Sequence, residues 1–182
     1  MILAPKVEGI LPLHSSPAAF IRAIRDRVAS GLLGPNVPRS RYAISHSTPD
    51  RVRIHAANWQ TAINVGLNDL ELRFDHVGKL EYRVRYWRWA TYVLAVGGIL
   101  GVIGLVVLVS FDARGYIASH PATQVPGFSI DQHVIIAWMM VLFWGFVWPW
   151  LLIALHKRPV QRLVERIVSD VDASGRTMSA ID

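Results

Sequence analysis

The sequence predicts a membrane protein of the α+β class: a two-helix transmembrane hairpin, a small N-terminal cytoplasmic domain of one helix and an antiparallel sheet, and a C-terminal amphipathic helix. Three observations lead to this prediction. Two long stretches carry no Asp, Glu, Lys or Arg, the basic residues near these stretches are concentrated on one side, and strand-like alternation precedes the first stretch. The 182 residues leave room for one small soluble domain beside the spans.

The two charge-free stretches are each long enough to cross a bilayer. Residues 89–111 form a stretch of 23 residues, and residues 132–156 form one of 25 residues with histidines only near its ends. A helix over the shorter stretch rises about 34 Å, slightly more than the hydrocarbon layer of about 30 Å. A buried hairpin in a soluble protein would need large apolar faces around both helices, which the remaining chain does not supply.

Basic residues near the span ends predict the orientation. Lys and Arg resist translocation and therefore stay cytoplasmic. The connecting segment 112–131 carries Arg114 alone, so we expect it outside as a short cap, with both chain ends in the cytoplasm of a bacterial-type inner membrane. The opposing set comprises Arg73, Lys79, Arg83, Arg85 and Arg88 before the first span and Lys157, Arg158, Arg162 and Arg166 after the second.

The N-terminal segment 1–15 is predicted to be extended, and a helix is predicted to follow it. No basic leader precedes a long apolar run in this segment, so we expect no cleavable secretion signal. Ser16 and Pro17 have the residue types of an N-cap and first helical position, and Gly31 supplies a stop. A stretch of Gly and Pro at 34–38 then leads to the strands.

The rest of the domain 16–88 alternates as strands do. Residues 42–46 and 52–54 are predicted to pair across a turn, and residues 80–86 give the cleanest alternation. A further strand is predicted from Ile63 to Phe74, with a bulge where the phase changes at Asn68 and Asp69. We therefore expect about four antiparallel strands packed on the helix, the last of them continuing into the first span.

The tail 157–182 is predicted to form an amphipathic helix. Its apolar residues recur at i, i+3, i+4 and i+7. The sequence leaves open whether this stripe covers the domain, lies in the headgroup layer, or docks on another subunit. The stripe comprises Val160, Leu163, Val164, Ile167, Val168 and Val171.

No set of residues predicts catalysis. The chain has no cysteine, which excludes disulfides, thiolate metal sites and cysteine nucleophiles. The histidines are not spaced as a metal pair on a helix, and neither span carries an acid or base that transport would need. The arginines crowd the predicted bilayer surface, so we expect no nucleic-acid partner. The sequence favours a protein that is not an enzyme and holds no metal or cofactor of its own.

Small residues define a packing face on the first span. Gly97 and Gly101 form a GxxxG motif, and Ala90 and Gly104 fall near the same helical face. Such a face lets another helix approach the backbone closely. The motif predicts which side packs and does not by itself predict a dimer.

The second span is crowded with aromatic rings. Trp usually marks the membrane interface, yet the middle of this span also carries it, and Gly145 and Pro149 predict a bend. Rings on all sides suit a helix surrounded by protein or by flat hydrophobic cofactors, although single rings facing lipid tails are equally consistent. The predicted contacts for a partner or its cofactor are Trp138, Trp144, Trp148, Trp150, His133 and His156.

These features predict a non-catalytic structural or accessory subunit of a larger membrane complex, with other membrane subunits and the bilayer as partners. In the special case of a respiratory or photosynthetic assembly, the aromatic span would border a partner's pigment, haem or quinone. The alternative is a membrane-anchored module that binds anionic lipid or a small hydrophobic ligand through its cytoplasmic domain. Predicted headgroup contacts are Arg83, Arg85, Arg88, Lys157 and Arg158.

Overall fold

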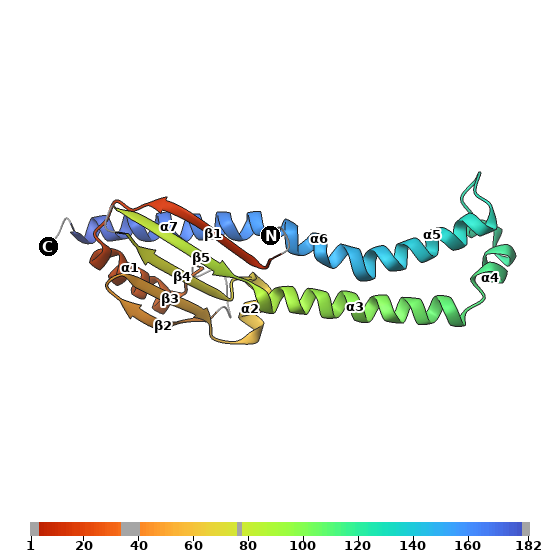
Figure 1. Ribbon diagram of the computed structural model, residues 1–182, viewed down its shortest axis with the longest axis horizontal. Coiled ribbons are helices and arrows are strands. Elements are labelled where there is room, and N and C mark those ends of the chain that lie inside the picture. The colour runs from red at the N-terminus through yellow and green to blue at the C-terminus, as the bar shows by residue number, and fades with distance from the viewer. Residues whose placement is uncertain (1–3, 34–40, 76–77, 180–182) are drawn as a thin grey trace. The chain divides into compact units, whose positions relative to one another are not determined.

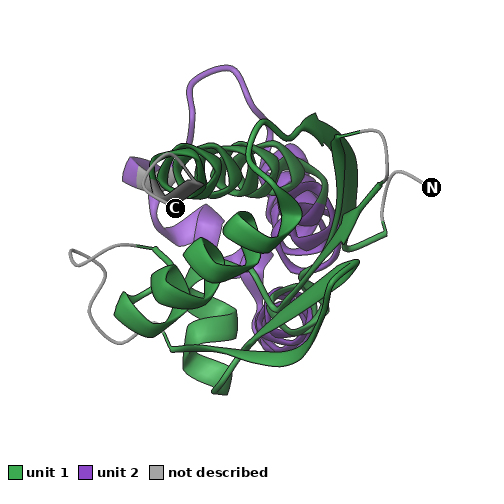
Figure 2. Cartoon of the chain, turned by 90° about the vertical axis from the view of Figure 1, so that its left-hand side faces the viewer, with its two compact units in different colours: residues 1–91, 154–182 green, residues 92–153 purple. Residues whose placement is uncertain are grey.

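A computed structural model describes residues 4–33, 41–75 and 78–179, and it divides the chain into two compact units. Unit 1 comprises residues 1–91 and 154–182, and unit 2 comprises residues 92–153 (Figure 2). The hairpin is therefore an insertion into the sequence of one α+β domain. The predicted stop-rich stretch at 34–38 lies outside the described residues.

Unit 1 contains a five-stranded antiparallel sheet in the order β1-β5-β4-β3-β2 (Figure 1). This confirms the expected α+β class, with one strand more than predicted. The additional strand, β1, lies in the segment expected to be merely extended and pairs with β5. The bounds are β1 Lys6–Pro12, β2 Tyr42–Thr48, β3 Arg51–Ala56, β4 Asp69–Phe74 and β5 Lys79–Arg85.

The sequence signal for β1 is weak because a glycine in this strand makes room for a side chain of the neighbouring strand. Gly9 lies opposite Tyr82 of β5, and a Cβ on Gly9 would stand 2.5 Å from the Tyr82 hydroxyl. Glycine thus leaves the space that the tyrosine ring occupies. A pairing of this kind across strands cannot be seen in local alternation.

The first helix, α1 (Pro17–Ser30), forms where it was predicted. The Ser16 hydroxyl accepts a hydrogen bond from the Ala19 backbone N–H, and Gly31 ends the helix with a φ of 106°. The helix buries Phe20 and Ile24 completely. The cap and the stop are local features, which is why this helix is predictable.

The prediction that a strand begins at Ile63 is wrong. Residues Trp59–Val65 form a short helix, α2, and the strand begins only at Asp69. The Asn58 side chain caps α2 by accepting from Thr61 N at 2.7 Å, and Gly66 ends it in the left-handed region. No bulge interrupts β4; the irregularity lies in β2, between Ile44 and His46. Capping at both ends outweighs the short alternation of Ile63 and Val65.

The tail helix α7 (Lys157–Ser179) belongs to the same compact unit as the sheet and packs against α1 and β1 (Figures 1 and 2). The choice that the sequence left open is thereby resolved in favour of the domain. The apolar stripe of α7 supplies core residues although it follows both spans in the chain. Its buried members are Val160, Val164, Ile167, Val168 and Val171.

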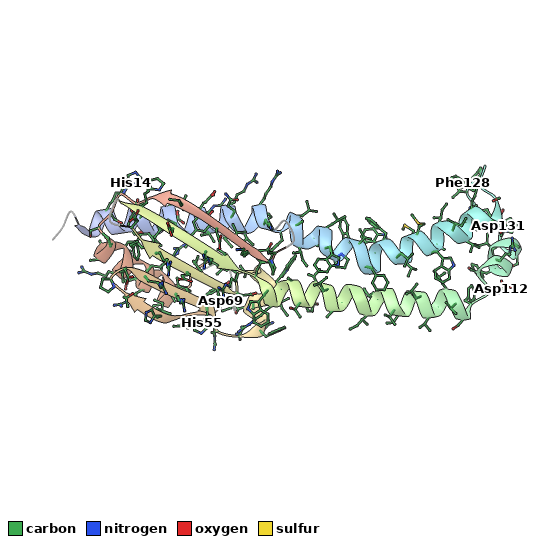
Figure 3. All side chains as sticks on the ribbon, viewed as in Figure 1. His14, His55, Asp69, Asp112, Phe128 and Asp131 are labelled. Atoms are coloured by element: carbon green, nitrogen blue, oxygen red, sulfur yellow. The ribbon has the colours of Figure 1, made fainter. Side chains whose placement is uncertain are left out.

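A buried carboxylate fixes the far end of α7. Asp172 is 4% exposed and accepts hydrogen bonds from the Ser15 hydroxyl at 2.7 Å and the Ser15 N–H at 2.8 Å. The His14 N–H and ring Nδ1 also lie within 3.3 Å of it (Figure 3 labels His14). Burial alone would raise the pKa of Asp172, but these hydrogen bonds outweigh it and hold the pKa below its usual value.

Unit 2 holds most of the two long apolar helical segments. Helix α3 (Trp87–Ser110) is continuous, and the second segment consists of α5 (Ile130–Leu142), the π-helical turn η2 (Phe143–Val147) and α6 (Trp148–Leu155). By length and composition the chain has two helices that could cross a membrane. Most of their apolar side chains are not buried; Val109, for example, is 73% exposed.

The π-helical turn stands directly before Pro149. Trp148 N–H donates to Phe143 O, five residues back, instead of to the usual fourth residue. Pro149 has no N–H to donate to the carbonyl of Gly145, four residues earlier. The regular α-helical hydrogen bond is therefore missing here, and the wider π-helical turn is compatible with its absence. This turn contains Gly145 and ends two residues before Pro149, the two residues at which the sequence predicts a bend.

The connecting segment contains more structure than a bare cap. It forms the short helix α4 (Ala113–Ser119) and the 3-10 turn η1 (Pro121–Thr123). The Asp112 side chain caps α4 by accepting from Gly115 N, and Arg114 pairs with Asp131 at the start of α5. Figure 3 labels Asp112 and Asp131.

Candidate functional site

The best-formed candidate site in unit 2 is the face where α3 and the second apolar segment pack together. Close packing there uses the glycines that the sequence singled out. A Cβ on Gly101 would come within 2.9 Å of both Gly145 Cα and the Phe146 ring, and a Cβ on Gly104 would come within 2.9 Å of Val141. Gly97 likewise faces Pro149. The predicted packing face is therefore occupied by the chain's own second segment.

Ala90 and Gly98 of α3 do not take part in this close packing. Ala90 lies in unit 1, where it is buried at 4% exposure. Gly98, which directly follows Gly97, has open space where a Cβ would be. The contrast shows that only one side of α3 requires glycine.

Beside the packed glycines lies an apolar groove with a volume of about 420 Å³. Both apolar segments contribute to its walls, and Gly97 and Gly145 belong to its lining. A groove of this volume is in the range of sites that take a small hydrophobic molecule or a few side chains of a partner. The other lining residues are Tyr92, Val93, Val96, Leu100, Met140, Val141, Trp144, Trp148, Pro149 and Leu152.

The structure brings together two of the four predicted tryptophans. Trp144 and Trp148 both line the groove, with ring centroids 4.9 Å apart in an edge-to-face arrangement, and Phe143 lies against both. Trp138 and Trp150 do not line it. The π-helical turn and Trp148 after it thus supply an aromatic cluster at one wall, rather than a ring of tryptophans around the whole helix.

His133 uses both ring nitrogens within the hairpin's own loop. Nε2 accepts a hydrogen bond from the Val125 N–H at 2.8 Å, and Nδ1 lies 2.8 Å from the Ser129 carbonyl. Because Nε2 accepts, Nδ1 carries the hydrogen and donates a hydrogen bond to the Ser129 carbonyl. In this arrangement neither nitrogen offers a lone pair to a partner's metal.

His156 lies in unit 1 and is packed among aromatic rings. Its ring stacks on Trp89 at 3.9 Å between centroids and contacts Tyr86 edge-on at 5.4 Å. Nε2 is buried without a hydrogen-bond partner and faces Gly66, where a Cβ would collide with it. These contacts join Tyr86 and Trp89, at the start of the first apolar segment, to the residue that directly follows the second.

Two of the four predicted headgroup arginines, Arg83 and Arg85, are on the outer face of the sheet, the face not packed on α1 and α7. Arg83 is one of them and pairs with Glu8 at 2.7 Å, while Glu71 lies within 3.5 Å of Arg51, Arg53 and Arg73. The face carries seven basic and four acidic side chains, with His55 and Asp69 labelled on it in Figure 3. They are Lys6, Arg51, Arg53, Arg73, Lys79, Arg83 and Arg85, and Glu8, Asp69, Glu71 and Glu81.

Arg88 differs from its two neighbours in the predicted cluster. Its guanidinium carbon lies 5.8 Å from the centroid of the Trp59 ring and 5.4 Å from that of Trp87. Lys157 and Arg158 begin helix α7, with Arg158 exposed. The predicted basic cluster therefore divides between the sheet face, a cation–π contact and a helix start.

Sequence reasoning missed Trp59. Its ring is 49% exposed and contacts Trp87 at 6.2 Å between centroids, although 27 residues separate the two in the chain. The signal that could have found it is Asn58, whose type and position suit a helix cap immediately before it.

Within the described ranges, no three His, Cys, Asp or Glu side chains are grouped so that they could hold a metal ion. Comparisons of the chain with protein family models, with curated proteins and with solved structures found no match. The function is therefore inferred from the geometry of this chain alone.

Proposed function

We propose that the protein is a non-catalytic accessory subunit of a larger membrane complex, in which the aromatic groove of the hairpin receives a transmembrane segment of a partner. The observation that carries this proposal is the groove itself. The hairpin uses its glycine face for its own packing and still leaves an apolar volume of about 420 Å³ between Tyr92 and Leu152. In hydrocarbon, helices associate through close van der Waals packing, which a ring-lined groove favours.

The position of the hairpin in the chain supports the membrane part of the proposal. Residues 91 and 154 belong to the same compact unit. If both helices cross the bilayer, the domain and the tail must therefore lie on one side of it. The basic residues before and after the hairpin favour the cytoplasmic side of a bacterial-type inner membrane.

Cross-linking from two neighbouring positions tests the proposal. Leu100 lines the groove, whereas Ile99 does not, and their exposures are 62% and 60%. Because the chain has no cysteine, Leu100→Cys and Ile99→Cys each introduce a unique attachment point for a short cross-linker. In native membranes we expect a discrete protein adduct from position 100 and not from position 99. Trp144→Ala should weaken the adduct.

Native sizing after mild detergent extraction provides the second measurement. The proposal expects co-migration with larger partners, and absorption across the visible range reports whether they carry haem or pigment. A protein that migrates at the size of the single chain, with equal cross-linking from positions 99 and 100, would contradict the accessory-subunit proposal.

The alternative function, a module that binds anionic lipid through its domain, is favoured by the three-charge surplus on the outer sheet face. Against it, several of those cations already pair with Glu8 and Glu71. Replacing Arg51, Arg53, Arg83, Arg85 and Arg88 by Ala separates the two functions. The lipid-binding alternative expects loss of binding to anionic liposomes with native size unchanged.

A further inference from the structure

We infer that helix α2 is a membrane-surface anchor, in which Trp59 and Trp87 enter the lipid–water interface together and Arg88 between them binds phospholipid phosphate. The inference rests on the proposed insertion of the hairpin, and it goes beyond it by assigning a second membrane contact to the cytoplasmic domain. The occupant of this surface is the headgroup layer of the bilayer.

Trp87 lies at the depth of the lipid–water interface when α3 crosses the bilayer. This residue begins α3, a helix of 24 residues that rises about 36 Å, against a hydrocarbon layer of about 30 Å. Arg88 is the last charged residue before the apolar stretch. An arginine at that point places its cation at the phosphate level, and a tryptophan beside it is in the layer that indole rings prefer.

Trp59 lies at nearly the same depth as Trp87. The two indole rings are 6.2 Å apart, and the interfacial layer on each side of a bilayer is about 5–8 Å thick. Both rings are nearly half exposed, at 49% and 44%. An exposed ring so close to Trp87 therefore lies at or near the same layer, whatever the orientation of the rest of the domain.

Hydrogen bonds through Asn68 hold α2 beside the start of α3. Asn68, which is 1% exposed, donates from Nδ2 to the Ala62 carbonyl in α2 at 3.1 Å and accepts at Oδ1 from the Arg88 N–H at 2.7 Å. One buried side chain thus hydrogen-bonds both helices and satisfies a free N–H in the first turn of α3. The relative position of Trp59 and Trp87 is fixed by this link.

The chemistry at this surface matches a phospholipid headgroup. Arg88 contacts the faces of two indoles, which orients its stem while its charge remains available at a partly exposed position. Amphipathic rings beside a cation are the combination that lipid interfaces favour.

The test uses single-cysteine labels in the full-length, naturally cysteine-free chain, reconstituted in phosphatidylcholine vesicles containing about a quarter phosphatidylglycerol. An environment-sensitive fluorophore at Gln60→Cys reports on α2 and leaves the tryptophan pair intact. The matched control is Lys79→Cys, which is exposed at the opposite end of β5 from the span, about 20 Å along the strand from Arg85. Lipids with a nitroxide near the headgroup act as quenchers.

We expect quenching at position 60 to exceed that at position 79 by about twofold or more. Trp59→Ser should lower it to the level of the control, and Trp59→Tyr should preserve most of it. Arg88→Gln should remove the dependence on phosphatidylglycerol, whereas Arg88→Lys should keep it.

A further label separates failure of the anchor from failure of the hairpin. Ile103→Cys lies within the charge-free stretch of α3 and should be quenched by lipids with the nitroxide deep in the acyl chain. Equal quenching at 60 and 79 with Ile103 quenched overturns the anchor alone. A blue-shifted label at 60 without lipid quenching also overturns it, because protein would then cover the site. Absence of quenching at 103 overturns the spanning hairpin, and the anchor with it.

Discussion

The two units of this chain place apolar side chains in opposite ways. In β5 the apolar residues Leu80, Tyr82 and Val84 are buried and the charged residues between them are exposed. In the hairpin, apolar residues such as Leu100 and Val109 remain exposed, while Gly97, Gly101 and Gly104 face the second apolar segment of the same chain. Burial within the chain therefore identifies the core of unit 1, whereas the exposed apolar side chains of unit 2 suit a hydrocarbon surrounding.

Removing the hairpin should have the largest effect on the location of the protein and little effect on the fold of unit 1. The Trp89 and His156 rings stack at 3.9 Å, so the two ends of unit 1 that border the insertion are adjacent. Replacing residues 92–153 with a flexible linker of about six residues should give a water-soluble chain that unfolds cooperatively. Size-exclusion chromatography and urea unfolding measure this outcome, and an aggregated or non-cooperative product would show that unit 1 depends on the hairpin.

Ending the chain after His156 should have the next largest effect, this time on the fold of the domain. The truncation removes five buried Val and Ile side chains, each of which stabilises by about 1.5–3 kcal/mol, against a total stability of about 5–15 kcal/mol. In the soluble excised domain we expect the cooperative transition to disappear.

A point substitution gives the same test at smaller scale. Val164→Asp buries a charge at a fully buried position of α7, and Ser169→Asp adds the same charge at an exposed position of the same helix. Circular dichroism during urea titration should show severe destabilisation for the first variant only. Equal curves for the two would mean that α7 is not part of the core.

These expectations also indicate what the sequence could predict. The caps of α1, Ser16 and Gly31, and the charge-free stretches are local signals, so the helix and the apolar segments were predicted correctly. Strand β1 and helix α2 were not, because Gly9 is explained by Tyr82 in another strand and Ile63 looked like part of a strand. The glycine face was predicted from spacing, whereas the Trp59–Trp87 pair depends on tertiary structure and was missed.

Glycine substitutions test whether the two apolar segments of the hairpin pack closely. Gly101→Ile places a side chain against Gly145 and Phe146, whereas Gly98→Ile adds the same atoms where no neighbour lies within 4 Å. Overpacking of this kind costs about 1–3 kcal/mol, so the first variant should unfold earlier in a detergent-denaturation series and the second should match wild type. The two positions differ by three residues in one helix, which keeps helix propensity and hydrophobicity the same. A similar loss at both would mean that the close contact with Gly145 does not hold the hairpin together.

The Asp172 carboxylate ties α7 to the start of α1. Asp172 and Asp170 are both on α7, but Asp172 is buried among hydrogen bonds from Ser15 and His14, whereas Asp170 is exposed and makes a longer contact with Arg27 at 3.8 Å. Asp172→Asn should lower the free energy of unfolding of the excised domain by about 1–3 kcal/mol, and Asp170→Asn should change it by less than about 0.5 kcal/mol.

The pH dependence distinguishes the charge of Asp172 from its shape. Because its folded-state pKa lies below the unfolded value of about 3.9, the stabilisation is complete above that value and is lost as the pH falls through the folded pKa. The difference between wild type and Asp172→Asn, measured by urea unfolding, should therefore be constant near neutral pH and shrink under acid conditions. If it persists unchanged in acid, the variant acts by disturbing packing, and the ionised carboxylate is not what fastens the tail to the domain.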